Sequence, residues 1–158
     1  MERKIKLRDI VGYLPYGLNV FDKTQGNFFK YEIDDRWDIY QVLEDDLLIP
    51  ILRPLSDLCK TITHNGKEII PIIELADISY ANNDWFLNEH NSAECENYIF
   101  GYSGMSFWCI NTKKQYDEKV YYQFALFDFM NELKIDYRGL IENKIAISCY
   151  DLSENPYK

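Results

Sequence analysis

The chain lacks any hydrophobic run long enough to cross a membrane. A membrane-spanning helix needs roughly 18 or more apolar residues, and no stretch of the 158 residues approaches that length. The N-terminus is basic but has no continuous apolar segment of the kind that a signal peptide carries. The Asn-x-Ser/Thr glycosylation sequence is also absent. We therefore expect a cytoplasmic protein that does not enter a membrane.

Positive charge is scarce. The sequence has 26 Asp and Glu residues against 17 Lys and Arg residues, which gives a formal net charge of −9 and an isoelectric point near 4.7. Affinity for nucleic acid comes largely from Lys and Arg side chains that displace counterions, so the charge argues against a nucleic-acid partner. The acidic side chains dominate residues 34–46 and 84–96, which is typical of a solvated surface.

Glycine-rich phosphate-binding loops are missing as well, because neither a Walker A loop nor a GxGxxG pattern occurs. The stretch 101–106, GYSGMS, is similar to the nucleophile elbow of hydrolases, but its second glycine comes one position too early. His64 and His90 also precede Ser103, whereas that arrangement requires a histidine after the serine. A tight hairpin turn explains these residues better. We therefore expect no catalytic residues and no cofactor.

Cysteine and histidine are few, and their spacing offers one zinc-ligating candidate set. It consists of two mirrored pairs with the same separation: Cys59, His64, His90 and Cys95. Two cysteines and two histidines make a zinc shell, but structural zinc sites usually pair like residues at short spacing. Buried cysteines and exposed histidines are the simpler interpretation, so we expect no metal. The acidic residues of 84–96 do not have the spacing of a calcium loop either.

The length of 158 residues predicts one globular domain over residues 1–158. Hydrophobic periodicity predicts that it begins with short elements. Apolar positions four and three residues apart predict a short helix over 7–14. Two extended runs, 16–21 and 28–33, flank turn residues and predict a hairpin. The conformation of residues 34–48 stays open between a strand and an irregular loop.

The middle of the chain predicts a second short helix over residues 54–63, where Ser56 and Asp57 provide capping oxygens. Residues 67–75 follow as an extended run that Pro71 limits to the edge of a sheet. Residues 76–97 are polar and mixed, and they are consistent with a short helix or a long loop.

The C-terminal third predicts a second hairpin from residues 97–102 and 105–111. Residues 112–134 form the strongest helical pattern, with an apolar stripe made of Val120, Phe124, Phe127, Met130 and Leu133. A strand is predicted over 144–149, and the tail from about 153 is expected to fray. Hairpins with separated helices and no βαβ alternation indicate an α+β fold, with antiparallel hairpins packed on one long C-terminal helix and two short helices.

Three blocks of the chain carry a family resemblance. They are LRDIVGYLPYGL at 7–18, ILRPLSDL at 51–58 and DYRGLIENKIAI at 136–147. Their order and spacing resemble a family of small uncharacterised proteins from Bacteroides-type gut bacteria and their phages. The resemblance implies a cytoplasmic bacterial protein encoded by a phage or prophage. It implies no activity.

The candidate binding residues come from these blocks and from the aromatic side chains among the acids. Arg53, Asp57 and Arg138 are candidates to line a groove, although Arg–carboxylate pairs that orient the core edge explain them better. The aromatic candidates, which would supply anchoring contacts in an interface, are Trp37, Tyr40 and Trp85.

The sequence therefore favours a non-catalytic, acidic protein-binding module that modulates a host or phage protein. Two alternatives stay open. One is an enzyme whose carboxylates or Cys–His pair are assembled in space. The other is an inhibitor that presents carboxylates in the pattern of DNA phosphates. The partner is expected to be another protein, and the oligomeric state stays undetermined.

Overall fold

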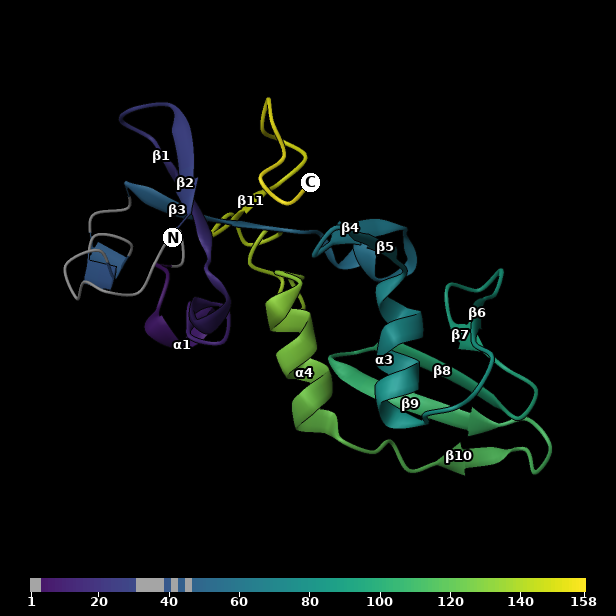
Figure 1. Ribbon diagram of the computed structural model, residues 1–158. Helices are drawn as coiled ribbons and strands as arrows, with labels where there is room; N and C mark the ends of the chain where they lie inside the picture. The colour runs from purple at the N-terminus through teal and green to yellow at the C-terminus, as the bar shows by residue number, and fades with distance from the viewer. Residues whose placement is uncertain (1–3, 31–38, 41–42, 45–46) are drawn as a thin grey trace. The chain divides into compact units, whose positions relative to one another are not determined.

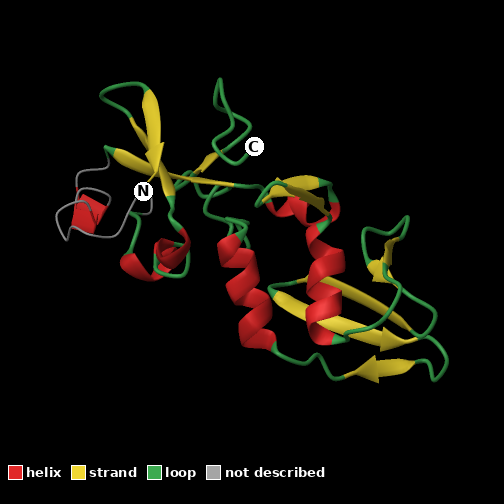
Figure 2. Cartoon of the chain, in the orientation of Figure 1, coloured by secondary structure: helices red, strands yellow, loops and turns green. Residues whose placement is uncertain are grey.

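The computed structural model describes residues 4–30, 39–40, 43–44 and 47–158 (Figures 1 and 2). It has the mixed α+β character that the sequence predicts, arranged in two compact units. Unit 1 comprises Met1–Leu55 and Met130–Lys158, so it is built from both ends of the chain. Unit 2 is the continuous stretch Ser56–Phe129. Within the described residues, every helix is too short or too polar to span a lipid bilayer.

Unit 1 contains a four-stranded sheet with the order β11-β3-β1-β2. Strands β1 (Asn19–Asp22) and β2 (Asn27–Lys30) are antiparallel and overlap the ranges 16–21 and 28–33 from which the sequence predicts a hairpin. Strand β3 (Leu48–Leu52) pairs antiparallel with β1, and β11 (Ile147–Ser148) pairs parallel with β3. The predicted strand over 144–149 is therefore realised as two residues.

The turn between β1 and β2 is held by Asp22. Its carboxylate accepts hydrogen bonds from the backbone N–H of Thr24 at 2.7 Å and from the Thr24 hydroxyl at 2.6 Å. The hydroxyl bond is the main cause of a lowered pKa for Asp22, since hydrogen bonds to a carboxylate favour its charged form. Gly26 follows with φ +68°, a conformation that favours glycine.

The N-terminal helical segment packs on the chain just before β11. The predicted helix over 7–14 is split into α1 (Leu7–Ile10) and the 3₁₀ helix η1 (Leu14–Tyr16), where Pro15 ends the α-helical pattern. Tyr13 lies between them, is fully buried and donates its hydroxyl to the carbonyl oxygen of Ile135 at 3.0 Å.

A short parallel bridge joins the end of β3 to the same segment. The Arg53 N–H donates to the Lys134 carbonyl at 2.8 Å, and the Asp136 N–H donates to the Arg53 carbonyl at 2.9 Å. The buried Asp136 carboxylate then accepts the N–H groups of Leu140 (2.9 Å) and Ile141 (2.7 Å), which turns the chain back toward β11. Parts of the three sequence blocks that carry the resemblance therefore meet inside unit 1.

Unit 2 is built on a five-stranded antiparallel sheet with the order β10-β9-β8-β7-β6. The strands are β6 (Phe86–Leu87), β7 (Ala93–Glu94), β8 (Tyr98–Ser103), β9 (Ser106–Asn111) and β10 (Tyr116–Glu118). Strands β8 and β9 overlap the ranges of the second predicted hairpin. Gly104 and Met105 join them with φ +57° and +64°, as a tight hairpin turn of type I′ requires.

The region before this sheet differs from the sequence prediction. Only Leu55–Cys59 of the predicted helix over 54–63 is helical, as the 3₁₀ helix η2, and a small hairpin of β4 (Ile62–His64) and β5 (Lys67–Ile69) follows. The extended run predicted for 67–75 is wrong beyond Ile69. Pro71 begins the helix α3 (Pro71–Ser79), because the first position of a helix needs no N–H donor.

The long helix predicted over 112–134 is also wrong in its first half. Helix α4 covers only Gln123–Glu132, and the edge strand β10 precedes it. The buried Asn111 turns the chain into β10, since its side-chain oxygen accepts the Lys114 N–H and its carbonyl accepts the Gln115 N–H. The apolar stripe therefore shifts, and Leu126, Met130 and Leu133 are buried whereas Phe124 is 95% exposed.

We expect that replacing Tyr13 by Phe will lower the free energy of unfolding by about 0.5–1.5 kcal/mol, because it removes one of the two donors to the Ile135 carbonyl, which keeps the Tyr137 N–H. Tyr122→Phe is the matched control, since that ring is 69% exposed and its hydroxyl reaches water. Urea denaturation of both variants measures the difference. Equal stability of the two variants would contradict the importance of the Tyr13 bond.

Candidate functional site

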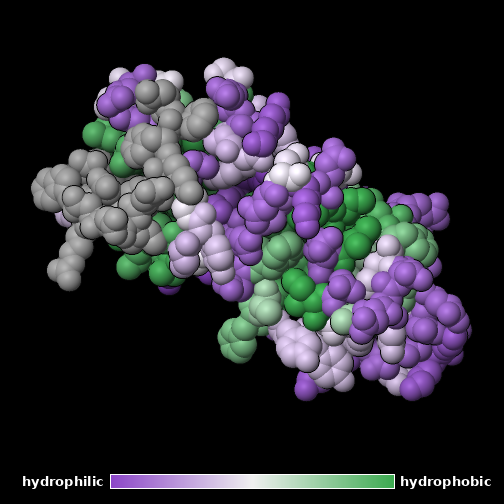
Figure 3. Space-filling view, in the orientation of Figure 1, coloured by the Kyte–Doolittle hydropathy of each residue, from purple (hydrophilic) through white to green (hydrophobic). Residues whose placement is uncertain are grey.

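The five-stranded sheet of unit 2 has one covered face. In Figure 1, helix α3 crosses in front of β8 and β9, and helix α4 stands beside the ends of these strands. On this side the ring of Tyr80, at the end of α3, stacks on Tyr98 with centroids 4.9 Å apart, and Phe127 of α4 meets the ring of Phe107 at 5.1 Å. Figure 3 views unit 2 from this side and shows hydrophobic residues reaching the surface around α3.

The opposite face of the same sheet is open. Along β9, Phe107, Cys109 and Asn111 are buried, whereas Trp108 is half-buried and Ile110 is exposed. Successive side chains of a strand point to opposite faces, so Trp108 and Ile110 belong to the face away from the helices. The burial pattern therefore identifies an outer face on which apolar side chains meet solvent.

Strand pairing aligns five of these outer side chains in one row. Asp117 pairs with Ile110, Ile110 with Ile99, Ile99 with Glu94, and Glu94 with Phe86. Directly paired residues share a face, so the row crosses all five strands. We call it the open row. In the open row, the side chain of Phe86 is 52% exposed and that of Ile110 is 36% exposed. One carboxylate lies on each side of the two isoleucines.

Trp108 extends the open row into a broader surface. It pairs with Gly101, and its ring occupies the space that a side chain at Gly101 would need. A Cβ atom at position 101 would clash with the six-membered ring of the Trp108 indole. The glycine thus lets the indole lie against the sheet, next to Ile99 and Ile110.

The covered face holds two titratable groups that stay neutral at pH 7. Burial raises the pKa of Tyr80, whose hydroxyl donates to the Lys119 carbonyl. Burial also raises the pKa of the Cys109 thiol, to about 11. Because the thiolate is the nucleophilic form, Cys109 is an inert, buried side chain.

The candidate residues Arg53, Asp57 and Arg138 belong to different units. In unit 1, the buried Arg53 guanidinium donates to the Tyr157 carbonyl at 2.5 Å and lies over the Tyr157 ring, 5.3 Å from its centroid. The Tyr157 hydroxyl donates to the Ile51 carbonyl, so the tail that was expected to fray is anchored at this residue.

Arg138, also in unit 1, donates to the Arg8 carbonyl at 2.8 Å and to the Tyr137 hydroxyl at 3.2 Å. Asp57, in unit 2, is fully buried and pairs with Lys60 at 3.2 Å. The contacts of Arg138 and Asp57 are structural within their units.

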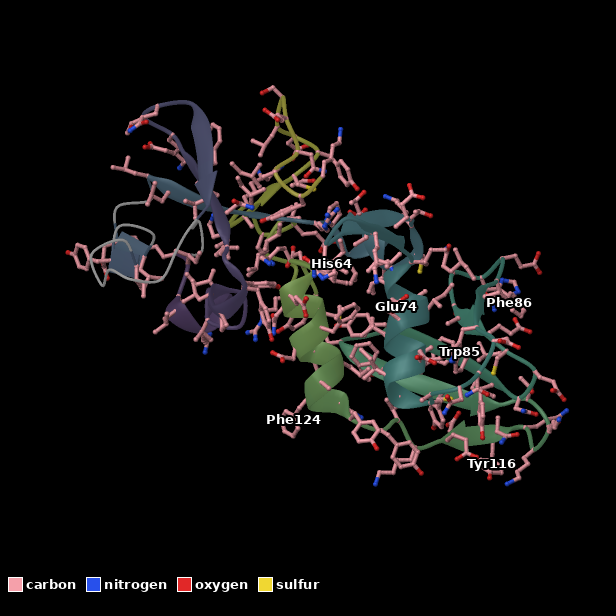
Figure 4. The ribbon with its side chains drawn as sticks, viewed as in Figure 1. His64, Glu74, Trp85, Phe86, Tyr116 and Phe124 are labelled. Carbon is pink, nitrogen blue, oxygen red and sulfur yellow. The ribbon has the colours of Figure 1, made fainter. Side chains whose placement is uncertain are left out.

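The aromatic candidates have separate surroundings. Trp85 is half-buried and donates its indole N–H to the Tyr80 carbonyl at 3.3 Å, next to Phe86 of the open row (Figure 4). Tyr40 is 51% exposed. Trp37 and most of the acidic stretch 34–48 lie outside the described residues.

The four zinc candidates all lie in unit 2 but do not assemble. The Cys59 thiol donates to the Asn91 carbonyl at 3.1 Å, and His64 lies edge-on to the Phe129 ring. His90 is exposed beside Glu89, whereas Cys95 is buried. In the part of the chain that the structure describes, no three His, Cys, Asp or Glu side chains form a metal-binding group.

A second exposed aromatic group stands apart from the open row. Tyr121, Tyr122 and Phe124 lie at the start of α4, and Figure 4 shows Phe124 projecting away from the helix. Sequence periodicity placed Phe124 on a buried stripe and therefore missed this group. It missed the open row because strand pairing, which periodicity does not report, creates it.

We expect that Gly101→Ala will lower the free energy of unfolding by about 1–3 kcal/mol, because the added methyl group displaces the Trp108 indole. The same change in a Trp108→Ala background removes the clash and should be neutral or stabilising by up to about 1 kcal/mol. Urea unfolding of the four proteins gives the coupling energy. A penalty that persists without the indole would contradict the proposed packing.

We also expect that dialysis against a metal chelator will leave the melting temperature unchanged, because the Cys59, His64, His90 and Cys95 side chains do not form a tetrahedral shell. Differential scanning calorimetry before and after dialysis measures this. A lower melting temperature that added zinc restores would show that these residues hold a structural metal.

Comparison of the chain with protein-family models, with curated proteins and with solved structures finds no match. The resemblance that the three sequence blocks indicate therefore stays a prediction.

Proposed function

We propose that the chain is a non-catalytic protein-binding module that holds its partner on the open face of unit 2. One observation carries this proposal: a row with three apolar side chains, Ile110, Ile99 and Phe86, crosses the solvent side of a sheet whose other side is covered by helices. A one-sided antiparallel sheet ordinarily alternates apolar residues inside with polar residues outside. Phe86, Ile99, Ile110 and Trp108 depart from that rule on one continuous surface, and such patches typically mark interaction sites.

The dimensions of the open row suit a macromolecule. Neighbouring strands lie about 4.8 Å apart, so a row across five strands is about 19 Å long. Small ligands bind in concave cavities that enclose most of their surface. A sheet face with an indole and a phenyl ring instead provides the aromatic anchors that dominate protein–protein interfaces.

The chemistry of unit 2 supports binding without catalysis. Cys109 and Tyr80 lie on the covered face with raised pKa values, so neither supplies an ionised nucleophile at neutral pH. In line with the family resemblance, we further propose that the protein is phage- or prophage-encoded, acts in the bacterial cytoplasm and modulates a host or phage protein.

We expect that Phe86→Lys combined with Ile110→Lys will abolish capture of the partner, because two charges replace the exposed apolar contacts of the open row. Loss of one such anchor residue weakens the binding free energy by at least about 1–2 kcal/mol, which is about 10-fold in affinity. The measurement is affinity purification from a Bacteroides-type lysate with the tagged full chain, followed by quantitative mass spectrometry.

The control is Phe124→Lys, which places a charge on the other exposed aromatic group at 95% exposure. Circular dichroism confirms that each variant is folded. Retention of the partner by the open-row variant, with its loss in Phe124→Lys, would assign binding to the start of α4 and refute the proposed surface.

A further inference from the structure

We propose that the occupant of the open face is a cationic amphipathic helix, with Lys or Arg side chains at the two ends of an aliphatic stripe that runs along the helix. This inference rests on the proposed function and names the chemical class of the partner. It follows from the order of charged and apolar groups along the open row.

The order of side chains along the row is acid, isoleucine, isoleucine, acid and phenylalanine. Asp117 and Glu94 stand on either side of the Ile110–Ile99 pair, three strand spacings apart, which is about 14 Å. Glu94 accepts a hydrogen bond from the neutral Asn88 amide at 2.9 Å, and Asp117 has no ion pair with any residue that the structure describes. Both carboxylates therefore keep their negative charge available to an occupant.

The surrounding charge has the same sign. Unit 2 contains 11 Asp and Glu residues against 5 Lys residues, a net of −6. A negative surface attracts cationic partners over long range and opposes anionic ones. A second copy of this chain, with a net charge of −9, would bring like carboxylates together on the same face. A nucleic acid would be repelled for the same reason.

The geometry of a sheet face favours a helix over an extended peptide. An extended segment has backbone N–H and C=O groups that need partners, and it finds them at the edge of a sheet. A helix satisfies its own backbone groups and can lay one apolar side on the isoleucines. Cations that reach both carboxylates would stand about nine or ten residues apart, since a helix rises about 1.5 Å per residue.

The experiment uses the full chain and three labelled synthetic helices with the same leucine stripe. The flanking positions carry Lys in the first helix, Gln in the second and Glu in the third. Fluorescence anisotropy gives each dissociation constant at several salt concentrations. We expect the Lys helix to bind at least about 10-fold more tightly than the Gln helix, and the Glu helix most weakly, with a difference that shrinks as salt increases.

The charge variant is Glu94→Gln combined with Asp117→Asn, which should weaken the Lys helix about 10-fold and flatten its salt dependence. The matched control is Glu74→Gln combined with Asp77→Asn, the same change of charge at exposed positions of α3 on the covered side (Figure 4). The control should change affinity by less than about 2-fold, because these acids lie away from the open row. Equal weakening by both pairs would show non-specific attraction and overturn the proposal.

A third pair, Phe86→Ser with Ile110→Ser, separates the two levels of the inference. If the Gln and Lys helices bind equally and both are weakened by this pair, the open face binds helices but the cationic class is wrong. If this pair leaves every affinity unchanged, or if no helix binds, the open face itself fails as the binding surface.

Discussion

The register of β8 against β9 is the constraint on which the rest of unit 2 depends. A slip of one residue would move every side chain of a strand to the other face. The turn at Gly104 and Met105 and the buried side chains Phe100, Phe107 and Cys109 all favour the same register. That register sends Trp108 and Ile110 outward. The surface proposed for binding is thus a consequence of the packing that stabilises the covered face.

Unit 1 is organised around a different constraint, which is the short segment that precedes β11. The carbonyl of Ile135 accepts the Tyr13 hydroxyl, and its neighbours bridge to Arg53 through the backbone. Tyr13 and Arg53, which lie in two of the sequence blocks that carry the resemblance, therefore depend on this one segment for hydrogen bonds in a buried setting, where an unpaired group is costly.

The open row shows how a sheet can keep its stability while offering a binding surface. Its apolar side chains add little to the core, because the helices pack on the other face. Asp117 lies on the edge strand β10, where a charged residue opposes edge-to-edge association between copies, and Glu94 adds a like charge on the same face. In the proposed function, the same two carboxylates would also select the charge of the partner.

The sequence by itself determined features that depend on near neighbours. These include the α+β class and the approximate positions of both hairpins, because turn residues and short periodic runs act locally. Proline was misread at Pro71, where the same fixed φ suits both the edge of a strand and the first turn of a helix. The long helix predicted over 112–134 is wrong in its first half, because pairing of β10 with β9 competes with helical propensity.

Only the tertiary structure decided that Asp117, Ile110, Ile99, Glu94 and Phe86 share one row. Phe86 and Asp117, at the two ends of the row, join it only through the order of the strands, and strand order is set by long-range packing that no local pattern contains.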